Sequence, residues 1–254
     1  MLDNTPSPLQ VLHHDAHIVA VNKPPGLLVH RTELDRGETD FALQRVRNQI
    51  GRRVYPIHRL DRPTSGVLVF ALDVESARAL GEALVGHTID KTYVAVVRGW
   101  PPAHSIIDRP LKRLDVPPGT PRQTQEARSE VWSLAEATVP VPVDRFPTTR
   151  YGLVAVKPHH GRRHQIRRHL NRLGHPIIGD VRHGKGVHNR FFREHFGVSR
   201  LLLHCRRMVI PHPSTGEDLT ITAPLDEGFQ KVCVGLGWGE VEVSGWRPEN
   251  QGPS

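Results

Sequence analysis

The chain has 254 residues, 37% of them hydrophobic and 24% charged, which is the balance of a globular protein with a sizeable core. No apolar run reaches the roughly 18–20 residues that a membrane-spanning helix needs, and the polar N-terminus lacks a signal-peptide pattern. The formal net charge of +8 favours polyanionic partners, and Cys205 and Cys233 are too few for a disulfide scaffold. We expect a cytoplasmic protein with two buried thiols.

The first hundred residues contain strand and helix patterns in turn. Apolar or alternating runs predict three strands: 17–21, 66–72 and 91–98. Helical spacing of apolar residues predicts a helix over 39–50 and another over 74–86. Asp73 stands where the N-cap of the second helix is expected.

The middle of the chain changes in composition. Residues 101–128 are rich in proline, glycine and charge, which predicts an exposed insertion with little order of its own. Residues 129–139 and 150–157 are predicted strands, and the proline-rich segment 140–149 connects them.

The last hundred residues begin with a basic helix over 163–173, which Gly174 and Pro176 should end. Two further strands, a helix and a loose tail are expected at 200–210, 219–222, 226–234 and 243–254.

These elements lack the regular βα alternation of a parallel sheet. The sequence therefore predicts the α+β class, with a mixed, largely antiparallel central sheet that helices flank. No linker requires a second unit, so we expect one catalytic domain over residues 9–235.

Residues 58–66 (HRLDRPTSG) carry the clearest chemical signal. Asp61 lies between Arg59 and Arg62, on a predicted loop. Pro63 restricts the backbone of this loop, and Gly66 gives it freedom where the buried strand begins. Flanking guanidinium groups lower the pKa of a carboxyl group, and a positioned, ionised aspartate can act as a nucleophile or a base. The alternative is a surface turn stabilised by salt bridges.

The helix predicted over 163–173 offers a partner for such a carboxylate. Its apolar stripe consists of Ile166, Leu170 and Leu173, and Arg167 stands at the edge of that stripe. An arginine in that place can reach a half-buried carboxylate through two hydrogen bonds. The arginines on the other faces are expected to contact solvent or phosphate: Arg162, Arg168 and Arg172.

Histidines near this helix raise the question of a metal. His160 and His164 are four residues apart, as a pair of ligands could be, but no acidic residue stands among them and the neighbouring arginines oppose a cation. We expect phosphate contact or capping instead, and no metal. Neither a phosphate-binding glycine loop nor a dinucleotide fingerprint is present, so no cofactor is expected.

Residues 58–66 resemble the catalytic loop of the RluA-type pseudouridine synthases. Residues 91–99 (KTYVAVVRG) resemble the second motif of that family, and 161–167 (GRRHQIR) the third, with HPIIGD following at 175–180. The resemblance runs from about residue 9 to residue 225, and the segment 145–153 is similar to a subgroup that acts on tRNA. It implies the catalytic fold of the family without an N-terminal S4 domain.

The resemblance also implies roles for single residues. Asp61 would attack the sugar of the target uridine or take a sugar proton, and Arg167 would pair with Asp61. Tyr93 would pack on the uracil and could help remove the proton from carbon 5; the alternative is an ordinary core tyrosine. The expected substrate-binding residues are Arg59, Arg62, Arg162, Arg163, His164 and Gln165.

A stacked uridine is out of reach of an enzyme, so the base must be flipped out, and Arg59 is expected to fill the gap it leaves. Arg59 could instead be a second salt-bridge partner of Asp61. The expected substrate is tRNA, at the uridine of position sixty-five in the T stem, and the expected state is a monomer. Another tRNA or ribosomal-RNA site, a non-catalytic RNA-binding or RNA-folding protein and a metal-dependent nuclease are the alternatives.

Overall fold

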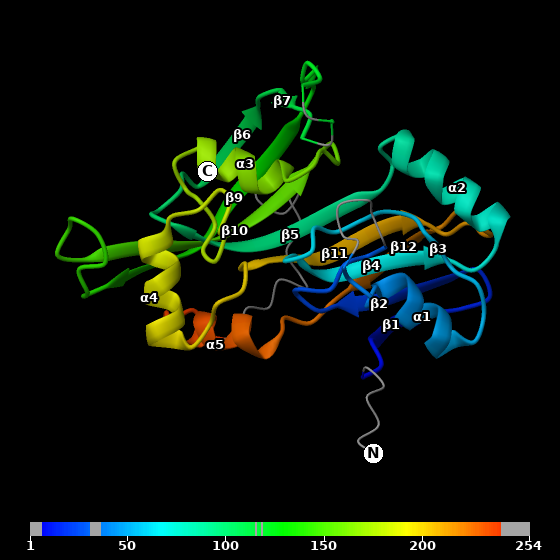
Figure 1. The fold of residues 1–254 in the computed structure, drawn as a ribbon, viewed down its shortest axis with the longest axis horizontal. Coiled ribbons are helices and arrows are strands. Elements are labelled where there is room, and N and C mark those ends of the chain that lie inside the picture. Colours follow the sequence, from blue (N-terminus) through cyan, green and yellow to red (C-terminus); the bar gives the residue numbers. More distant parts are fainter. Residues whose placement is uncertain (1–6, 31–36, 115, 118, 240–254) are drawn as a thin grey trace.

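The computed structural model describes residues 7–30, 37–114, 116–117 and 119–239. Within these residues a mixed, ten-stranded sheet forms the centre of the molecule, with the strand order β1-β2-β4-β11-β5-β10-β9-β6 (Figure 1). β12 pairs with β11 and β3 with β4, while β7 and β8 form a small sheet of their own. The strands are β1 (Gln10–His14), β2 (Ile18–Lys23), β3 (Tyr55–Pro56), β4 (Ser65–Ala71), β5 (Asp90–Arg98), β6 (His104–Asp108), β7 (Leu111–Lys112), β8 (Thr124–Gln125), β9 (Arg128–Val139), β10 (Thr149–Pro158), β11 (Leu203–Pro211) and β12 (Asp218–Thr222).

The expected α+β class with a mixed, largely antiparallel sheet is confirmed. Among the described strands, β4 and β11 pair in parallel and all other neighbours are antiparallel. The helices are α1 (Ala42–Ile50), α2 (Val74–Val85), α3 (Gln165–Arg172), α4 (Gly186–Phe196) and α5 (Glu227–Gly235). The sequence pattern had not predicted α4, and the tail expected at 243–254 lies outside the described residues.

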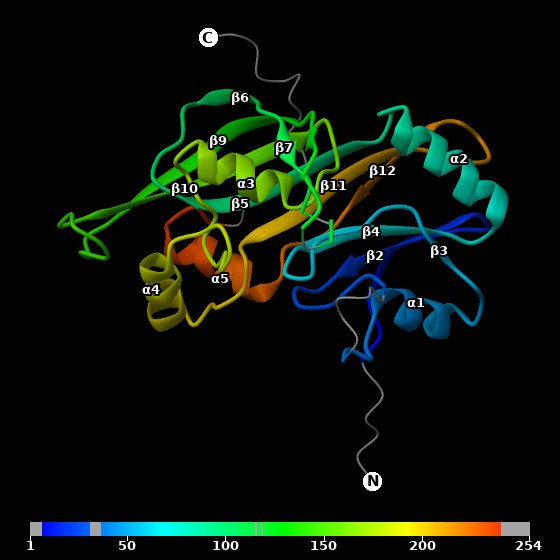
Figure 2. The same ribbon diagram turned by 45° about the horizontal axis from the view of Figure 1, so that its top comes forward.

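The alternation of side chains along β5 separates two hydrophobic clusters. Val94 and Val96 pack in one cluster with residues of α4 and α5, such as Phe192. Tyr93 and its neighbours on the other face belong to a second cluster that includes Leu170 of α3. α3 therefore covers one face of this part of the sheet and the α4–α5 pair covers the other (Figure 2).

The segment 101–128 is more ordered than its composition indicated. β6 within it extends the main sheet by pairing with β9, and Ile107 and Leu111 are buried. Two arginines of α3 hold the rest of the segment: Arg168 Nη1 donates to the carbonyl of Lys112 at 3.0 Å, and Arg172 Nη1 to that of Pro110 at 3.2 Å. Arg172 is exposed and Arg168 partly exposed, so both arginines also remain accessible to solvent, as expected.

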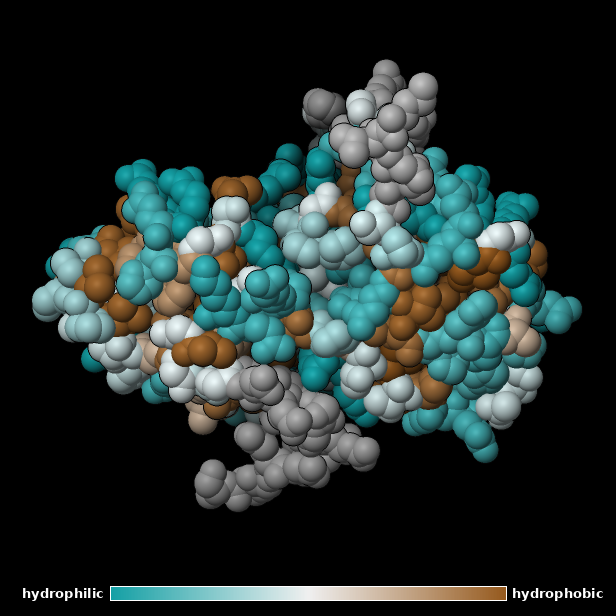
Figure 3. Space-filling view, turned by 90° about the horizontal axis from the view of Figure 1, so that it is seen from below, coloured by the Kyte–Doolittle hydropathy of each residue, from teal (hydrophilic) through white to brown (hydrophobic). Residues whose placement is uncertain are grey.

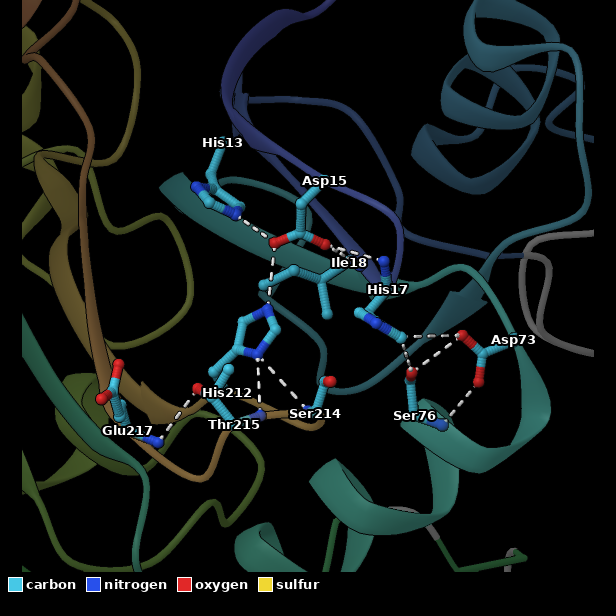
Figure 4. A network of polar contacts seen from close by, with 10 residues as sticks. All are labelled: His13, Asp15, His17, Ile18, Asp73, Ser76, His212, Ser214, Thr215 and Glu217. Atoms are coloured by element: carbon cyan, nitrogen blue, oxygen red, sulfur yellow. Dashed lines mark hydrogen bonds and ion pairs between the residues drawn. The ribbon is translucent and has the colours of Figure 1, made fainter.

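A polar network joins three loops at the edge of the sheet (Figure 4). One carboxylate oxygen of Asp15 contacts His13 Nε2 at 2.5 Å and His212 Nε2 at 3.1 Å, which ties the β1–β2 turn to the end of β11. Nearby, Asp73 caps α2 as expected, because its Oδ1 accepts the backbone N–H of Ser76 at 2.7 Å. The first residues of the sheet are thus held by side-chain hydrogen bonds as well as by strand pairing.

The surface seen from below is mostly hydrophilic, and its apolar residues appear in separate patches (Figure 3). None of the described helices is long and apolar enough to cross a membrane. Both cysteines are buried free thiols, as predicted.

Candidate active site

A cavity of about 1050 Å³ opens where the loop before β4, the start of β5 and the β10–α3 connection meet. It contains eight of the nine residues that the sequence singled out: Arg59, Asp61, Tyr93, Arg162, Arg163, His164, Gln165 and Arg167. These residues come from three segments that are far apart in the chain, and the sheet brings them together.

Asp61 and Arg167 form the expected ion pair inside this cavity. Arg167 Nη1 donates to Asp61 Oδ2 at 3.1 Å. The remaining donors of the same guanidinium bind a second carboxylate: Nε and Nη2 donate to the two oxygens of Asp180 at 2.7 and 2.9 Å. Arg167 is therefore fixed by Asp180 and presents one N–H to Asp61.

Burial alone would lower the pKa of Arg167, but the bonds to Asp180 and Asp61 outweigh it, so that pKa is raised. Burial likewise acts to raise the pKa of Asp180, whereas its bonds from Arg167 and from two backbone N–H groups lower it. Both groups are charged. Of the two carboxylates that Arg167 binds, Asp61, whose side chain is 19% exposed, lines the cavity and Asp180 does not. Asp61 is the half-buried carboxylate of the site, with a fixed cation behind it.

Asp180 is a member of the site that the sequence analysis did not name. It follows Gly179, which has φ +79°, and a Cβ on Gly179 would lie 1.9 Å from the carbonyl oxygen of Arg200. Asn189 of α4 fixes the same turn, because it accepts from the N–H of Gly179 at 2.8 Å and donates to the carbonyl of Asp180 at 3.0 Å. The HPIIGD segment at 175–180 was the available signal.

Lys23 is a second residue that the sequence analysis did not assign to the site. Its ammonium group is fully buried and donates to the carbonyls of Pro24, Leu27 and Arg62 at 2.9, 2.7 and 3.1 Å. Burial, with a smaller contribution from Arg200, lowers the pKa of Lys23 to about 7. Lys23 joins the loop after β2 to the loop that carries Asp61.

His58 anchors the start of the loop that carries Asp61. Its Nε2 accepts the backbone N–H of Val69 in β4 at 3.2 Å. Burial, and then the nearby Lys91, lower the pKa of His58 to about 3, so the ring is neutral and remains an acceptor. At the other end of the loop, the N–H of Thr64 donates to the carbonyl of Asp61 at 2.9 Å. This loop is therefore held at both ends.

Tyr93 lies at the start of β5, is 8% exposed and hydrogen-bonds Cys205. Burial, followed by the electrostatic interaction with Cys205 and the hydrogen bond to it, raises the pKa of this phenol well above 10. The phenol is protonated and neutral, which suits a ring that packs against a neutral base.

The predicted substrate-binding residues divide into groups. Arg59 is exposed, and Arg163 is partly exposed, and both line the cavity. Gln165 is buried, and its amide donates to the carbonyl of Arg128 and to Ser129 Oγ, so it braces the β10–α3 connection. Arg162 lines the cavity while its Nε donates to the carbonyl of Glu126 at 2.9 Å.

Arg62 differs from the others because it is not among the residues that line the cavity. Its Nε donates to the carbonyl of Gly26 at 3.0 Å, and its Nη1 lies 2.8 Å from Glu38. These contacts direct Arg62 to the neighbouring loop, whereas Arg59 lines the cavity.

The two histidines considered as a ligand pair have separate partners. His160 Nδ1 accepts the backbone N–H of Arg128 at 3.1 Å, whereas His164 Nδ1 is 3.0 Å from His183 Nε2. Among the described residues, no group of three or more histidine, cysteine or acidic side chains could hold a metal ion.

The chain is similar to known proteins over most of its length. Residues 17–172 match the family model described as RNA pseudouridylate synthase. A Vibrio cholerae protein named tRNA pseudouridine synthase C is 48% identical over 237 residues, which cover 91% of this chain and 97% of the relative. A Yersinia pestis protein of the same name is 47% identical over 238 residues, or 92% of this chain and 93% of the relative.

Solved structures support the fold. Human RNA Pseudouridylate Synthase Domain Containing 4 superposes with a TM-score of 0.68 at 24% identity, over 90% of this chain and 93% of that chain. Human RNA Pseudouridylate Synthase Domain Containing 1 has a TM-score of 0.66 at 21% identity, over 85% and 83%. With the family model and the curated relatives, these matches show that the chain belongs to the RNA pseudouridylate synthase family.

Proposed function

We propose that this protein converts a uridine of tRNA to pseudouridine without a cofactor, with Asp61 as the catalytic residue. The observation that carries the proposal is the arrangement of Asp61 in the cavity, where a buried arginine holds its carboxylate and leaves one side open. The curated relatives named tRNA pseudouridine synthase C, at 44–48% identity, support tRNA as the substrate.

The reaction is an isomerisation that balances within the substrate. The N1–C1′ glycosidic bond breaks, the uracil turns, and a C5–C1′ bond forms; C5 then loses a proton and N1 gains one. Asp61 either attacks the sugar or takes a sugar proton. Arg167 supports both routes, because a charge-assisted hydrogen bond keeps the carboxylate ionised and aimed.

Tyr93 belongs in this scheme as the surface on which the uracil packs. Its neutral phenol is a poor base in the free protein, since removal of its proton would create a charge in a buried place. Packing is therefore the role that its burial favours, and proton removal from C5 requires a group that becomes basic during the reaction.

The target base must leave its stack to reach Asp61, at a cost of a few kcal/mol. Arg59 is exposed at the cavity and can stack on the bases left behind while its charge meets phosphate. The proposed target is the uridine of position sixty-five, in the T stem, and we propose that the protein acts in the cytoplasm as a monomer.

The test is to incubate the protein with an unmodified tRNA transcript, without metal or nucleotide, and to map pseudouridine by carbodiimide labelling and primer extension. A single stop in the T stem is expected, absent with Asp61→Asn and retained with Asp218→Asn, a control at an exposed aspartate of β12. Stops elsewhere would keep the reaction and discard the position. Full activity of Asp61→Asn would overturn the mechanism.

A further inference from the structure

A pair of histidines stands beside the Asp61 carboxylate, next to Arg167. His164 Nδ1 lies 3.0 Å from His183 Nε2, and the two rings are nearly perpendicular, at 79°. The other nitrogen of His164, Nε2, lies 3.9 Å from Asp61 Oδ2. The order in space is therefore His183, His164 and Asp61.

Both rings are neutral. Burial lowers the pKa of His164 to about 4. Asp61 acts to raise this pKa, whereas the nearby Arg167, His183 and Arg163 lower it further. Burial also lowers the pKa of His183, where Asp180 acts to raise it and Arg167, Arg182 and Arg168 act to lower it. Each imidazole therefore carries one proton, and a hydrogen bond between them uses one N–H and one lone pair.

Two arrangements of those protons are possible. If His164 Nδ1–H donated to His183, the lone pair of His164 Nε2 would face the Asp61 carboxylate, and two electron-rich groups would oppose each other. If His183 Nε2–H donates to His164 Nδ1, the proton of His164 lies on Nε2 and faces the carboxylate. Coulomb's law favours the second arrangement in this half-buried place.

We propose that His183 is a positioning residue: it donates Nε2–H to His164 and thereby keeps an N–H of His164 directed at the Asp61 carboxylate. This inference rests on the proposed function of Asp61. It gives Asp61 Oδ2, which already accepts from Arg167, a second and neutral donor nearby, without a further positive charge among the arginines of α3.

The backbone supports this assignment. His164 stands at the N-cap of α3 with φ +55°, a left-handed conformation that a residue other than glycine seldom adopts. The N–H of His183 donates to Asp180 Oδ1 at 2.9 Å, and Asp180 also binds Arg167. One turn, 180–183, therefore positions both groups that face Asp61, which explains why a strained His164 is kept in place.

The test compares two substitutions at His183. Leucine removes the donor, whereas glutamine places an amide N–H near the position of Nε2. His183→Leu is expected to lower kcat on the tRNA transcript about 10-fold or more, as loss of an orienting partner does, with KM changed less than about twofold. His183→Gln should recover most of kcat, and Val181→Ala, at a position 93% exposed in the same turn, should match the wild type.

A second readout does not depend on activity. Nitrogen-15 NMR of the histidine rings should show His164 as the Nε2–H tautomer in the wild type and in His183→Gln, and as a mixture in His183→Leu. An Nδ1–H tautomer in the wild type, or wild-type kcat in His183→Leu, would overturn the inference. If His183→Leu does not fold, the tautomer of His164 in the wild type and in His183→Gln still tests the inference.

Failure of the inference is distinct from failure of the proposed function. A wild type that is active while Asp61→Asn is inactive, with His183→Leu unaffected, would remove only the role of His183. A wild type that modifies no tRNA would remove the proposed function, and the NMR measurement would still test the proton arrangement.

Discussion

Arg167 serves two carboxylates with one guanidinium group, and it does so while only 4% exposed. A buried ion pair gains little net stability, because desolvation offsets attraction, but removal of one partner leaves an uncompensated charge. The Asp180 carboxylate is 1% exposed and depends on Arg167 for its countercharge. Loss of Arg167 should therefore affect stability through Asp180 and, in the proposed mechanism, activity through Asp61.

Arg167→Leu is expected to lower the free energy of unfolding by about 3–5 kcal/mol, because Asp180 then stays buried and unpaired. The double variant Arg167→Leu/Asp180→Leu should recover most of that loss, yet form no pseudouridine, because Asp61 still lacks its donor. Urea unfolding and the carbodiimide assay measure the two quantities. A double variant as unstable as the single one would contradict this account.

At the scale of elements, the pairing of β4 with β11 sets the position of the loop that carries Asp61. The two strands pair in parallel only at Ser65–His204 and Gly66–Cys205. Gly66 has φ +111°, and a Cβ there would lie 2.2 Å from the carbonyl oxygen of Cys205. The glycine after this loop is required because another strand's backbone passes against it.

Gly66→Ala is therefore expected to destabilise the protein by about 2 kcal/mol or more, through strain and overpacking. The matched control is Gly81→Ala within α2, where no atom lies within 4 Å of the added Cβ. That substitution should stabilise the protein by about 0.5–1 kcal/mol, since glycine is a poor helix former. Thermal unfolding of both variants checks the pair, and equal effects would refute the explanation.

At the scale of the whole molecule, the net charge of +8 is available for phosphate contacts. Arg163 is placed at the cavity, whereas Arg193 belongs to α4, on the opposite face of the sheet. Affinity for tRNA should fall steeply as salt rises. Arg163→Gln should reduce the slope of log K against log salt by roughly one, and Arg193→Gln should leave it unchanged. Filter binding at several salt concentrations measures both, and identical slopes would exclude Arg163 as a phosphate ligand.

Buried histidines also make the stability of the whole molecule depend on pH. Burial lowers the pKa of His188 to about 4, that of His204 to about 4 and that of His58 to about 3, from an ordinary value of 6.5. Between about pH 6.5 and pH 4 the unfolded chain therefore binds more protons than the folded one, so the free energy of unfolding falls as pH falls.

This dependence has a matched test in His188→Gln. Tyr151 Oη lies 3.1 Å from His188 Nδ1, and an amide can keep that contact. The variant should lose less stability than the wild type between pH 6.5 and pH 4.5, in urea unfolding at each pH. Below about pH 4 the carboxylates add to the loss, since the bonds from His13 and His17 outweigh burial and lower the pKa of Asp15. Parallel curves for variant and wild type would contradict the prediction.

Local patterns predicted most elements, because their signals lie within the segments themselves. The apolar run at 66–72 became β4, and Asp73 caps α2. The segment 101–128 is exposed over much of its length, as its composition indicated, but its order could not be predicted, because that order comes from pairing with β9 and from arginines of α3. Composition cannot report a contact that another part of the chain supplies.

The sequence by itself determined the residues on which the proposed chemistry rests: a carboxylate between arginines, a strand tyrosine and an arginine at the edge of an apolar helix stripe. These are properties of short segments, in which spacing fixes what one face presents. Only the tertiary structure decided that Asp180 holds Arg167, that Lys23 joins two loops and that Arg62 points away from the cavity. Such contacts join residues distant in the chain, and they are settled only when the strands pair and the side chains compete for the same buried partners.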